Sequence, residues 1–287
     1  MKRIISIFCL MSVSLMSYAQ DNSITFTQEQ LKLPKKKGAC FTLSSNPRKG
    51  HYTKNMARVI ALNAGWNYSW GYNLAPNQPE DIEFVPMAWG RYNEEDLLSK
   101  MLPLVESGRI KRFLGFNEPD GKKQSDITVD QAIAMWPTLM KLGIPLGSPA
   151  PVHADKEWLE EFMHKVDSLN YRVDYICVHA YPGTSVENFA KRLTSIYNKF
   201  QKPLLITEFA PADWKAKTKE ENRLKPENVL NFMKGILDWM EKTEFVYGYA
   251  WFSFEPNSPV GFPSALFDEN GDLTELGKFY AAYEPNR

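Results

Sequence analysis

Cysteine and histidine are scarce in this chain. Of three cysteines in 287 residues, Cys9 lies near the start, which leaves Cys40 and Cys177. Two are too few for the disulfide framework of a small exported scaffold. Both lie in apolar runs, so we expect two buried thiols rather than a bridge. The four histidines lack ligand spacing, which argues against a zinc site. We expect no metal and no organic cofactor.

The chain also lacks an excess of charge of either sign. Its 34 basic and 34 acidic residues balance, and losing Lys2 and Arg3 with a leader would leave a net charge of −2. The basic footprint of a nucleic-acid-binding protein is missing. We therefore expect no nucleic-acid partner, and we expect a monomer.

No segment is long and apolar enough to read as a membrane span. The apolar stretch Ile4–Met16 is too short for that, but it follows Lys2 and Arg3 and precedes the small residues of Ser17-Tyr18-Ala19. This is the pattern of a secretory signal peptide over residues 1–19. We expect a secreted or periplasmic protein with no membrane insertion, in which residues 20–287 form a single domain.

The rest of the chain contains eight short apolar runs, mostly separated by amphipathic stretches. The runs are Ala39–Leu43, Trp66–Tyr72, Phe84–Ala88, Phe113–Asn117, Ile144–Gly147, Val173–His179, Leu204–Glu208 and Tyr247–Phe252. Strands that alternate with helices predict an α/β fold with a parallel sheet. Eight repeats in about 250 residues predict a closed (β/α)8 TIM barrel.

Helix signals fill most of the intervals between these runs. Asn93 and Ser185 are candidate N-caps, and Thr128 with Gln131 forms a capping box. The expected helices are Lys54–Ala64, Glu94–Glu106, Ala132–Lys141, Trp158–Ser168, Val186–Phe200, Val229–Met240 and Thr274–Tyr283. Only about ten residues with two prolines, 73–82, link the second and third runs. A crossover helix needs a dozen or more residues, so we expect an imperfect barrel without a regular second helix.

Two glutamates each follow an apolar run directly. Glu118 lies beyond the fourth run and before Pro119, and Glu208 closes the seventh. The C-terminal ends of barrel strands are where active sites lie, and a pair of carboxylates there can cleave a glycosidic bond. The alternatives are a carboxylate that caps the next loop, for Glu118, and an ion pair across the barrel mouth, for Glu208.

Polar residues next to these glutamates are further candidates. Asn117 precedes Glu118 at the strand tip. His179 and Tyr181 end the sixth run and point the same way, because side chains alternate along a strand. Tyr181 could donate its hydroxyl to Glu208 and hold it ionised as a nucleophile. For His179, a buried histidine with a satisfied ring nitrogen is the alternative.

Aromatic residues gather at the predicted strand ends. Clefts for glycans are often lined with aromatic side chains, because sugar rings have apolar faces. Trp89 and Trp251 end the third and eighth runs, and we expect both to contact substrate. Trp214, in the loop after Glu208, is also a candidate for substrate contact, and core packing is an equal alternative.

Five ordered motifs resemble glycoside hydrolase family 128, β-1,3-glucanases of clan A with a compact, imperfect β/α barrel. The likeness spans about Gly38 to Tyr283. The motifs are Phe84-Val85-Pro86-Met87-Ala88-Trp89-Gly90, Gly115-Phe116-Asn117-Glu118-Pro119-Asp120, Leu146-Gly147-Ser148-Pro149-Ala150, Val173-Asp174-Tyr175-Ile176-Cys177-Val178-His179 and Ile206-Thr207-Glu208-Phe209-Ala210.

The resemblance implies a role for four residues. Glu118 would be the acid/base and Glu208 the nucleophile of a retaining endo-β-1,3-glucanase, with Asn117 on the sugar 2-hydroxyl and Tyr181 orienting Glu208. The expected partner is a β-glucan polysaccharide or oligosaccharide. Two alternatives stay open: a barrel that cleaves another β-glycan such as mannan, cellulose or mixed-linkage glucan, and an inactive barrel that only binds glycan.

Overall fold

The structure, a computed structural model, describes residues 24–43 and 52–285. The expected signal peptide, residues 1–19, lies outside them. Each predicted apolar run overlaps one strand, with bounds that differ by a few residues. In the described part of the chain these strands are β1 (Lys37–Cys40), β2 (Trp66–Tyr68), β3 (Glu83–Phe84), β4 (Phe113–Leu114), β5 (Leu146–Gly147), β6 (Ile176–Ala180), β7 (Leu204–Phe209) and β8 (Val246–Trp251).

The strands close into one parallel ring. Six of them form a sheet in the order β3-β2-β1-β8-β7-β6, and β4 pairs with β5. Every strand pair is parallel. Parallel bridges from Met87 to Leu114 and from Gly147 to Tyr175 join the two sheets. The ring is therefore complete, and the predicted imperfect barrel is confirmed.

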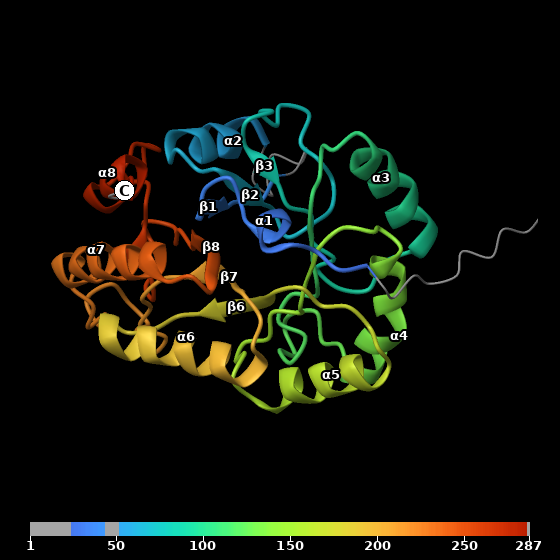
Figure 1. Ribbon diagram of the computed structural model, residues 1–287. Helices are drawn as coiled ribbons and strands as arrows, with labels where there is room; N and C mark the ends of the chain where they lie inside the picture. The colour runs from blue at the N-terminus through green and yellow to red at the C-terminus, as the bar shows by residue number, and fades with distance from the viewer. Residues whose placement is uncertain (1–23, 44–51, 286–287) are drawn as a thin grey trace, which may run out of the picture.

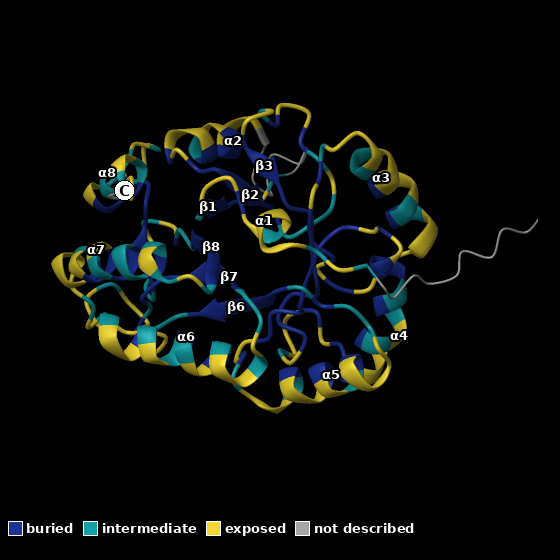
Figure 2. Cartoon of the chain, in the orientation of Figure 1, coloured by how far each residue is buried: buried dark blue, intermediate teal, exposed yellow. Residues whose placement is uncertain are grey.

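Helices surround this ring (Figure 1). They are α2 (Tyr52–Ala61), α3 (Glu94–Glu106), α4 (Val129–Met140), α5 (Glu157–Ser168), α6 (Val186–Phe200), α7 (Pro226–Lys242) and α8 (Glu275–Ala282). The side chains of Asn93 and Ser185 cap α3 and α6, and Thr128 with Gln131 forms the expected capping box of α4. Exposed residues lie on the outer faces of the helices, and the strands are buried (Figure 2).

The link between β2 and β3 contains no helix, as its length and prolines predict. Gln78 fastens this link to the barrel. Its side-chain nitrogen donates to Oδ1 of Asn67 at 2.8 Å and to the carbonyl of Ile82 at 2.9 Å. These two bonds replace part of the packing that a crossover helix would provide.

A short helix, α1 (Gln28–Leu31), lies over the centre of the ring in Figure 1 and was not predicted. Buried Arg112, at the start of β4, pairs with Glu83 at 2.5 Å and donates to the carbonyl of Leu31 at 2.7 Å. Tyr175, before β6, donates to the same carbonyl at 2.7 Å. Because these contacts lie at the starts of strands, the N-terminal segment covers the end of the barrel opposite the strand tips.

The two remaining cysteines are free and buried, as expected. Cys40 lies in β1 and Cys177 in β6. Burial raises the pKa of both thiols. Within residues 24–43 and 52–285, none of the helices has the length and apolar character that crossing a bilayer requires.

Candidate active site

The two glutamates meet at the C-terminal end of the barrel. Glu208 lies in β7, and Glu118 follows β4 just beyond the bridge between Asn117 and Ala150. A carboxylate oxygen of each glutamate and a ring nitrogen of His179 lie within 4.8 Å of one another. The barrel thus brings together two carboxylates that are 90 residues apart in the sequence.

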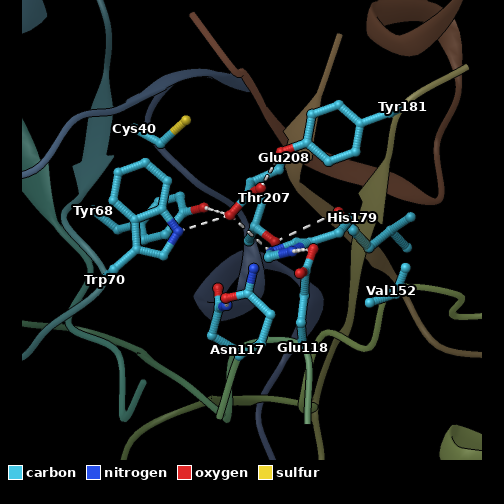
Figure 3. A network of polar contacts seen from close by, with 12 residues as sticks. Cys40, Tyr68, Trp70, Asn117, Glu118, Val152, His179, Tyr181, Thr207 and Glu208 are labelled. Atoms are coloured by element: carbon cyan, nitrogen blue, oxygen red, sulfur yellow. Dashed lines mark hydrogen bonds and ion pairs between the residues drawn. The ribbon is translucent and has the colours of Figure 1, made fainter. Parts of the chain in front are cut away.

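Glu208 receives three side-chain hydrogen bonds (Figure 3). The hydroxyl of Tyr181 donates to Oε2, the indole of Trp70 donates to Oε1 at 2.7 Å, and the hydroxyl of Tyr68 donates to Oε1 at 3.1 Å. Donors that point at a carboxylate stabilise its ionised form and fix its orientation. This is what an attacking carboxylate requires.

The two phenols that contact Glu208 keep their protons. Burial, followed by the charge of Glu208, raises the pKa of Tyr181 and of Tyr68 far above the ordinary value for tyrosine. Both hydroxyls are therefore donors at any pH at which the protein works.

Glu118 is held mainly through its backbone. Its φ is +39°, in the left-handed region that non-glycine residues rarely adopt. Its amide donates to the carbonyl of Ala150 at 2.8 Å, and its carbonyl accepts from the amide of Gly121 at 2.9 Å. A strained backbone held from both sides is typical of functional positions. Of the described side chains, His179 is the one hydrogen-bonded to its carboxylate, at 3.1 Å.

His179 lies between the two carboxylates with 1% of its surface exposed. Nδ1 faces Oε1 of Glu118 at 3.1 Å, and Nε2 faces Oε1 of Glu208 at 3.4 Å. Burial lowers the pKa of His179, but the charge of Glu208 and the hydrogen bond to Glu118 outweigh it. The net pKa is raised above the ordinary value.

The same three residues are also the candidate cation site of the described chain. In this arrangement the two ring nitrogens of His179 face different carboxylates. A metal ligand would instead turn one nitrogen lone pair toward the ion that the carboxylates share. The geometry therefore suits a histidine that is hydrogen-bonded to Glu118 and lies beside Glu208, with no hydrogen bond from its Nε2, better than a metal centre.

Asn117 has a free acceptor at the site. Its amide nitrogen donates to Oε1 of Gln124 at 3.3 Å, whereas its buried Oδ1 has no partner among the described residues. A buried acceptor without a partner is costly unless a ligand satisfies it. The residue lines the cavity, and this oxygen itself is enclosed by the protein.

The glutamates open into a cavity of about 1060 Å³. That is at the upper end of the range for ligand sites and leaves room for several sugar rings. Aromatic side chains line much of its wall: Trp70, Trp89, Tyr181, Trp214, Phe252 and Phe254. Trp89 is 40% exposed and Trp214 is 60% exposed, so both present free ring surface. The structure thus places these two candidates in the cavity wall.

The prediction for Trp251 is wrong. Trp251 is 1% exposed, packs edge-on against Phe209, and donates its indole hydrogen to the carbonyl of Ser264 at 2.9 Å. Side chains alternate along a strand, and Trp251 points outward into the layer between β8 and α7. The next residue, Phe252, points inward and lines the cavity.

Two of the three donors to Glu208 were not predicted from the sequence. Tyr68 and Trp70 belong to the second apolar run, where Trp66, Tyr68 and Trp70 alternate. That spacing places Trp66 and Tyr68 on one face of the strand and could have revealed Tyr68. Trp70 has a φ of +55°, so it lies past the regular strand, where alternation alone does not fix its direction.

A closed parallel barrel with two adjacent carboxylates in an aromatic-lined cavity at its strand tips defines a carbohydrate-cleaving class of protein. Residues 38–280 match the family model described as the glycosyl hydrolase catalytic core, and the chain belongs to this family.

Three relatives are similar to this chain. Alkali-sensitive linkage protein 1 of Schizosaccharomyces pombe is 28% identical over 228 residues, 75% of this chain. The chain spans only about two fifths of that protein's length, since the match covers 39% of it.

The other two relatives are solved structures of glycoside hydrolase family 128. A subgroup I endo-β-1,3-glucanase from Amycolatopsis mediterranei, in complex with laminarihexaose, is 27% identical with a TM-score of 0.71. The match covers 87% of this chain and 99% of that one. A subgroup VII oligosaccharide-binding protein from Trichoderma gamsii is 23% identical with a TM-score of 0.65, covers 87% and 94% of the two chains, and shares the fold.

Proposed function

We propose that this protein is a retaining endo-β-1,3-glucanase. The observation that carries the proposal is the pair of carboxylates in unequal settings. Glu208 accepts three side-chain hydrogen bonds, and Glu118 accepts one, from His179. The likeness to the Amycolatopsis mediterranei endo-β-1,3-glucanase, which binds laminarihexaose, supports the linkage.

The proposed reaction is a double displacement. Glu118 gives its proton to the glycosidic oxygen while Oε of Glu208 attacks the anomeric carbon, which forms a glycosyl ester and releases the leaving chain. Glu118 then takes a proton from water, and that water hydrolyses the ester and frees Glu208. Retaining enzymes have carboxyl groups about 5 Å apart. The carboxylate oxygens here lie within 4.8 Å, which supports retention.

Neighbouring side chains have supporting roles in this proposal. Tyr181 orients Glu208, and His179, whose Nδ1 faces Glu118, stabilises the charge that Glu118 acquires once it has given up its proton. Oδ1 of Asn117 accepts a hydrogen bond from the 2-hydroxyl of the sugar whose glycosidic bond is cleaved. Trp89 and Trp214 stack on sugar rings to either side, because both present exposed ring surface in the cavity wall.

We also propose export and action as a monomer. The pattern of residues 1–19 supports a cleaved signal peptide. All groups of the proposed site come from one chain, so a second copy adds nothing that the chemistry needs.

A time course of products on several glucans tests the function. The protein is incubated with laminarin, curdlan, cellulose and mannan, and the oligosaccharides are separated by length. We expect early release of mixed laminari-oligosaccharides from laminarin and curdlan, and little from the other two. Predominant cleavage of cellulose or mannan would show that the substrate is another β-glycan. Binding of laminarin without any hydrolysis would identify a glycan-binding barrel instead.

A further inference from the structure

The loop that follows β7, residues 211–225, carries Trp214 to the wall of the cavity. Trp214 is 60% exposed and packs edge-on against two rings, Tyr181 at 5.2 Å and Phe254 at 6.1 Å between centroids. Two edge contacts on one side of an exposed indole do not by themselves fix its orientation. Something else in the loop must hold this side chain in place.

The neighbouring residue, Asp213, is the most strongly bonded group of the loop. Its side chain is 3% exposed and faces Arg223, which is 71% exposed. The guanidinium donates through Nε to Oδ2 at 2.7 Å and through Nη2 to Oδ1 at 2.6 Å. The backbone amides of Arg223 and Lys215 also donate to the carboxylate, at 3.1 and 3.2 Å. We call this arrangement the Asp213–Arg223 clasp.

The Asp213–Arg223 clasp joins the two ends of the loop and is itself fixed to the barrel. The amide of Asp213 donates to the carbonyl of Val260 at 2.8 Å, and the side chain of Asn222 donates to the carbonyl of Pro259 at 2.7 Å. A bidentate pair between arginine and a carboxylate is strong, and its two parallel hydrogen bonds also fix the relative orientation of the two side chains. The position of Trp214, one residue after Asp213, is therefore set by the clasp.

Trp214 is also connected to the catalytic pair through one intermediate side chain. It touches the ring of Tyr181, and the hydroxyl of Tyr181 donates to Glu208. The clasp does not contact the cavity itself, since neither Asp213 nor Arg223 lines it. Any effect of the clasp on substrate must therefore pass through Trp214.

We propose that Asp213 and Arg223 are positioning residues for Trp214, and that Trp214 held in this way is the platform for a glucosyl unit bound away from the cleaved bond. This inference rests on the proposed function. In this proposal the clasp makes the enzyme prefer long glucan chains to short ones. A short chain can fill the centre of the cavity without reaching Trp214, whereas a long chain also contacts it.

Kinetics on laminari-oligosaccharides of different length test this assignment. Trp214→Ala should raise the KM for laminarihexaose about tenfold, the loss expected for one aromatic contact, and change the KM for laminaritriose little. Arg223→Ala should likewise raise the KM for laminarihexaose, change the KM for laminaritriose little, and leave kcat within about twofold. Arg223→Lys keeps the charge but not the bidentate geometry, so it should fall between the wild type and Arg223→Ala.

Two comparisons make the result decisive. Lys217→Ala is the matched control, because it removes one positive charge from an exposed side chain of the same loop and should leave both KM values unchanged. The double variant Trp214→Ala/Arg223→Ala should match Trp214→Ala alone, since positioning has no effect once the platform is gone. Additive losses, or an equal loss of kcat at every chain length, would overturn the assignment.

A readout without substrate separates this inference from the proposed function. In protein labelled with 5-fluorotryptophan, the ¹⁹F resonance of Trp214 is the one that disappears in Trp214→Ala. Arg223→Ala should shift or broaden that resonance, and Lys217→Ala should not. An unchanged resonance in Arg223→Ala would refute the positioning role even if glucan is cleaved. A shifted resonance with no glucan binding would refute the proposed substrate and leave the positioning role intact.

Discussion

The two carboxylates of the proposed active site are held by two different kinds of structure. Glu208 lies on β7, in the regular part of the barrel, where β6, β7 and β8 are five or six residues long. Glu118 follows β4, which like its partner β5 is only two residues long. Side chains that follow β6 and β2 hold Glu208, whereas a left-handed backbone and two backbone hydrogen bonds aim Glu118.

The difference matches the roles that we propose. A nucleophile must stay ionised and keep one direction, and three donors provide both. An acid/base must lose and regain a proton in each cycle, so a dense set of fixed donors would hinder it. Aiming Glu118 through the backbone fixes its position and leaves His179 as the one described side chain that is hydrogen-bonded to its carboxylate. The predictions that follow test this contrast.

The largest effect is expected for Glu208→Gln. The amide cannot attack the anomeric carbon, so kcat on laminarin should fall on the order of 10⁴- to 10⁶-fold, as for loss of a covalent nucleophile. Reducing-end release gives the rate, and far-UV circular dichroism shows whether the fold is kept. Glu187→Gln, an exposed change on α6, is the control and should be silent. Substantial activity in Glu208→Gln would reject the assignment.

Replacing the acid/base should depend on the leaving group. Glu118→Ala should lower kcat on laminarin about 10²- to 10⁴-fold, the usual range for general acid catalysis. On a dinitrophenyl β-laminaribioside the first step needs no protonation, so the initial burst of phenolate should persist. Stopped-flow absorbance measures that burst. If the burst is lost in Glu118→Ala but present in Glu208→Gln, the two roles are reversed.

The donors to Glu208 should each contribute less than the carboxylates. Removing one hydrogen bond to a charged group costs about 1.5–3 kcal/mol, so Tyr181→Phe should reduce kcat about 10- to 100-fold. Tyr92→Phe is the control, since its hydroxyl donates to the carbonyl of Met135 away from the cavity. If both variants kept the wild-type kcat, the hydrogen bonds to Glu208 would have no catalytic importance.

The smallest effect concerns His179 and pH. Its folded pKa is raised, so its contribution to stability is complete below the unfolded pKa of about 6.5 and is lost as pH rises through the folded value. Urea unfolding between pH 6 and 8 should show this loss in the wild type and not in His179→Gln. The range stops at pH 8 because burial lowers the pKa of Lys37 to about 8. Above that pH, the titration of Lys37 makes the protein more stable as pH rises, which would mask the loss from His179. The same slope in both proteins would exclude His179 as the titrating group.

Much of the fold could be read from the sequence. The eight apolar runs each overlap a strand, and the caps at Asn93, Thr128 and Ser185 fix three helix starts. The missing second helix followed from a link too short for a crossover. These features are local, since each depends on a few adjacent residues. The short α1 was missed because it is held by long-range hydrogen bonds. Arg112 and Tyr175 both donate to the carbonyl of its last residue, Leu31.

The site was only partly visible in the sequence. In a parallel barrel, the C-terminal ends of all strands lie at one end of the barrel. This rule alone predicted that Glu118, Glu208, His179 and Tyr181 lie close together. The direction of a side chain beyond the regular strand does not follow from it. That is why Trp70, with its left-handed backbone, was not recognised as a donor to Glu208. Trp251 is still part of β8, and it was assigned to the cavity in place of Phe252 because its position at the strand end was used without the alternation that points it outward.

The anomeric form of the first product tests the central claim most directly. Laminarihexaose is hydrolysed in an NMR tube, and the anomeric proton of the new reducing end is followed before mutarotation sets in. A double displacement through Glu208 predicts that the β-anomer appears first and the α-anomer grows later by mutarotation. If the α-anomer appears first, water attacks the sugar directly and Glu208 is not a nucleophile.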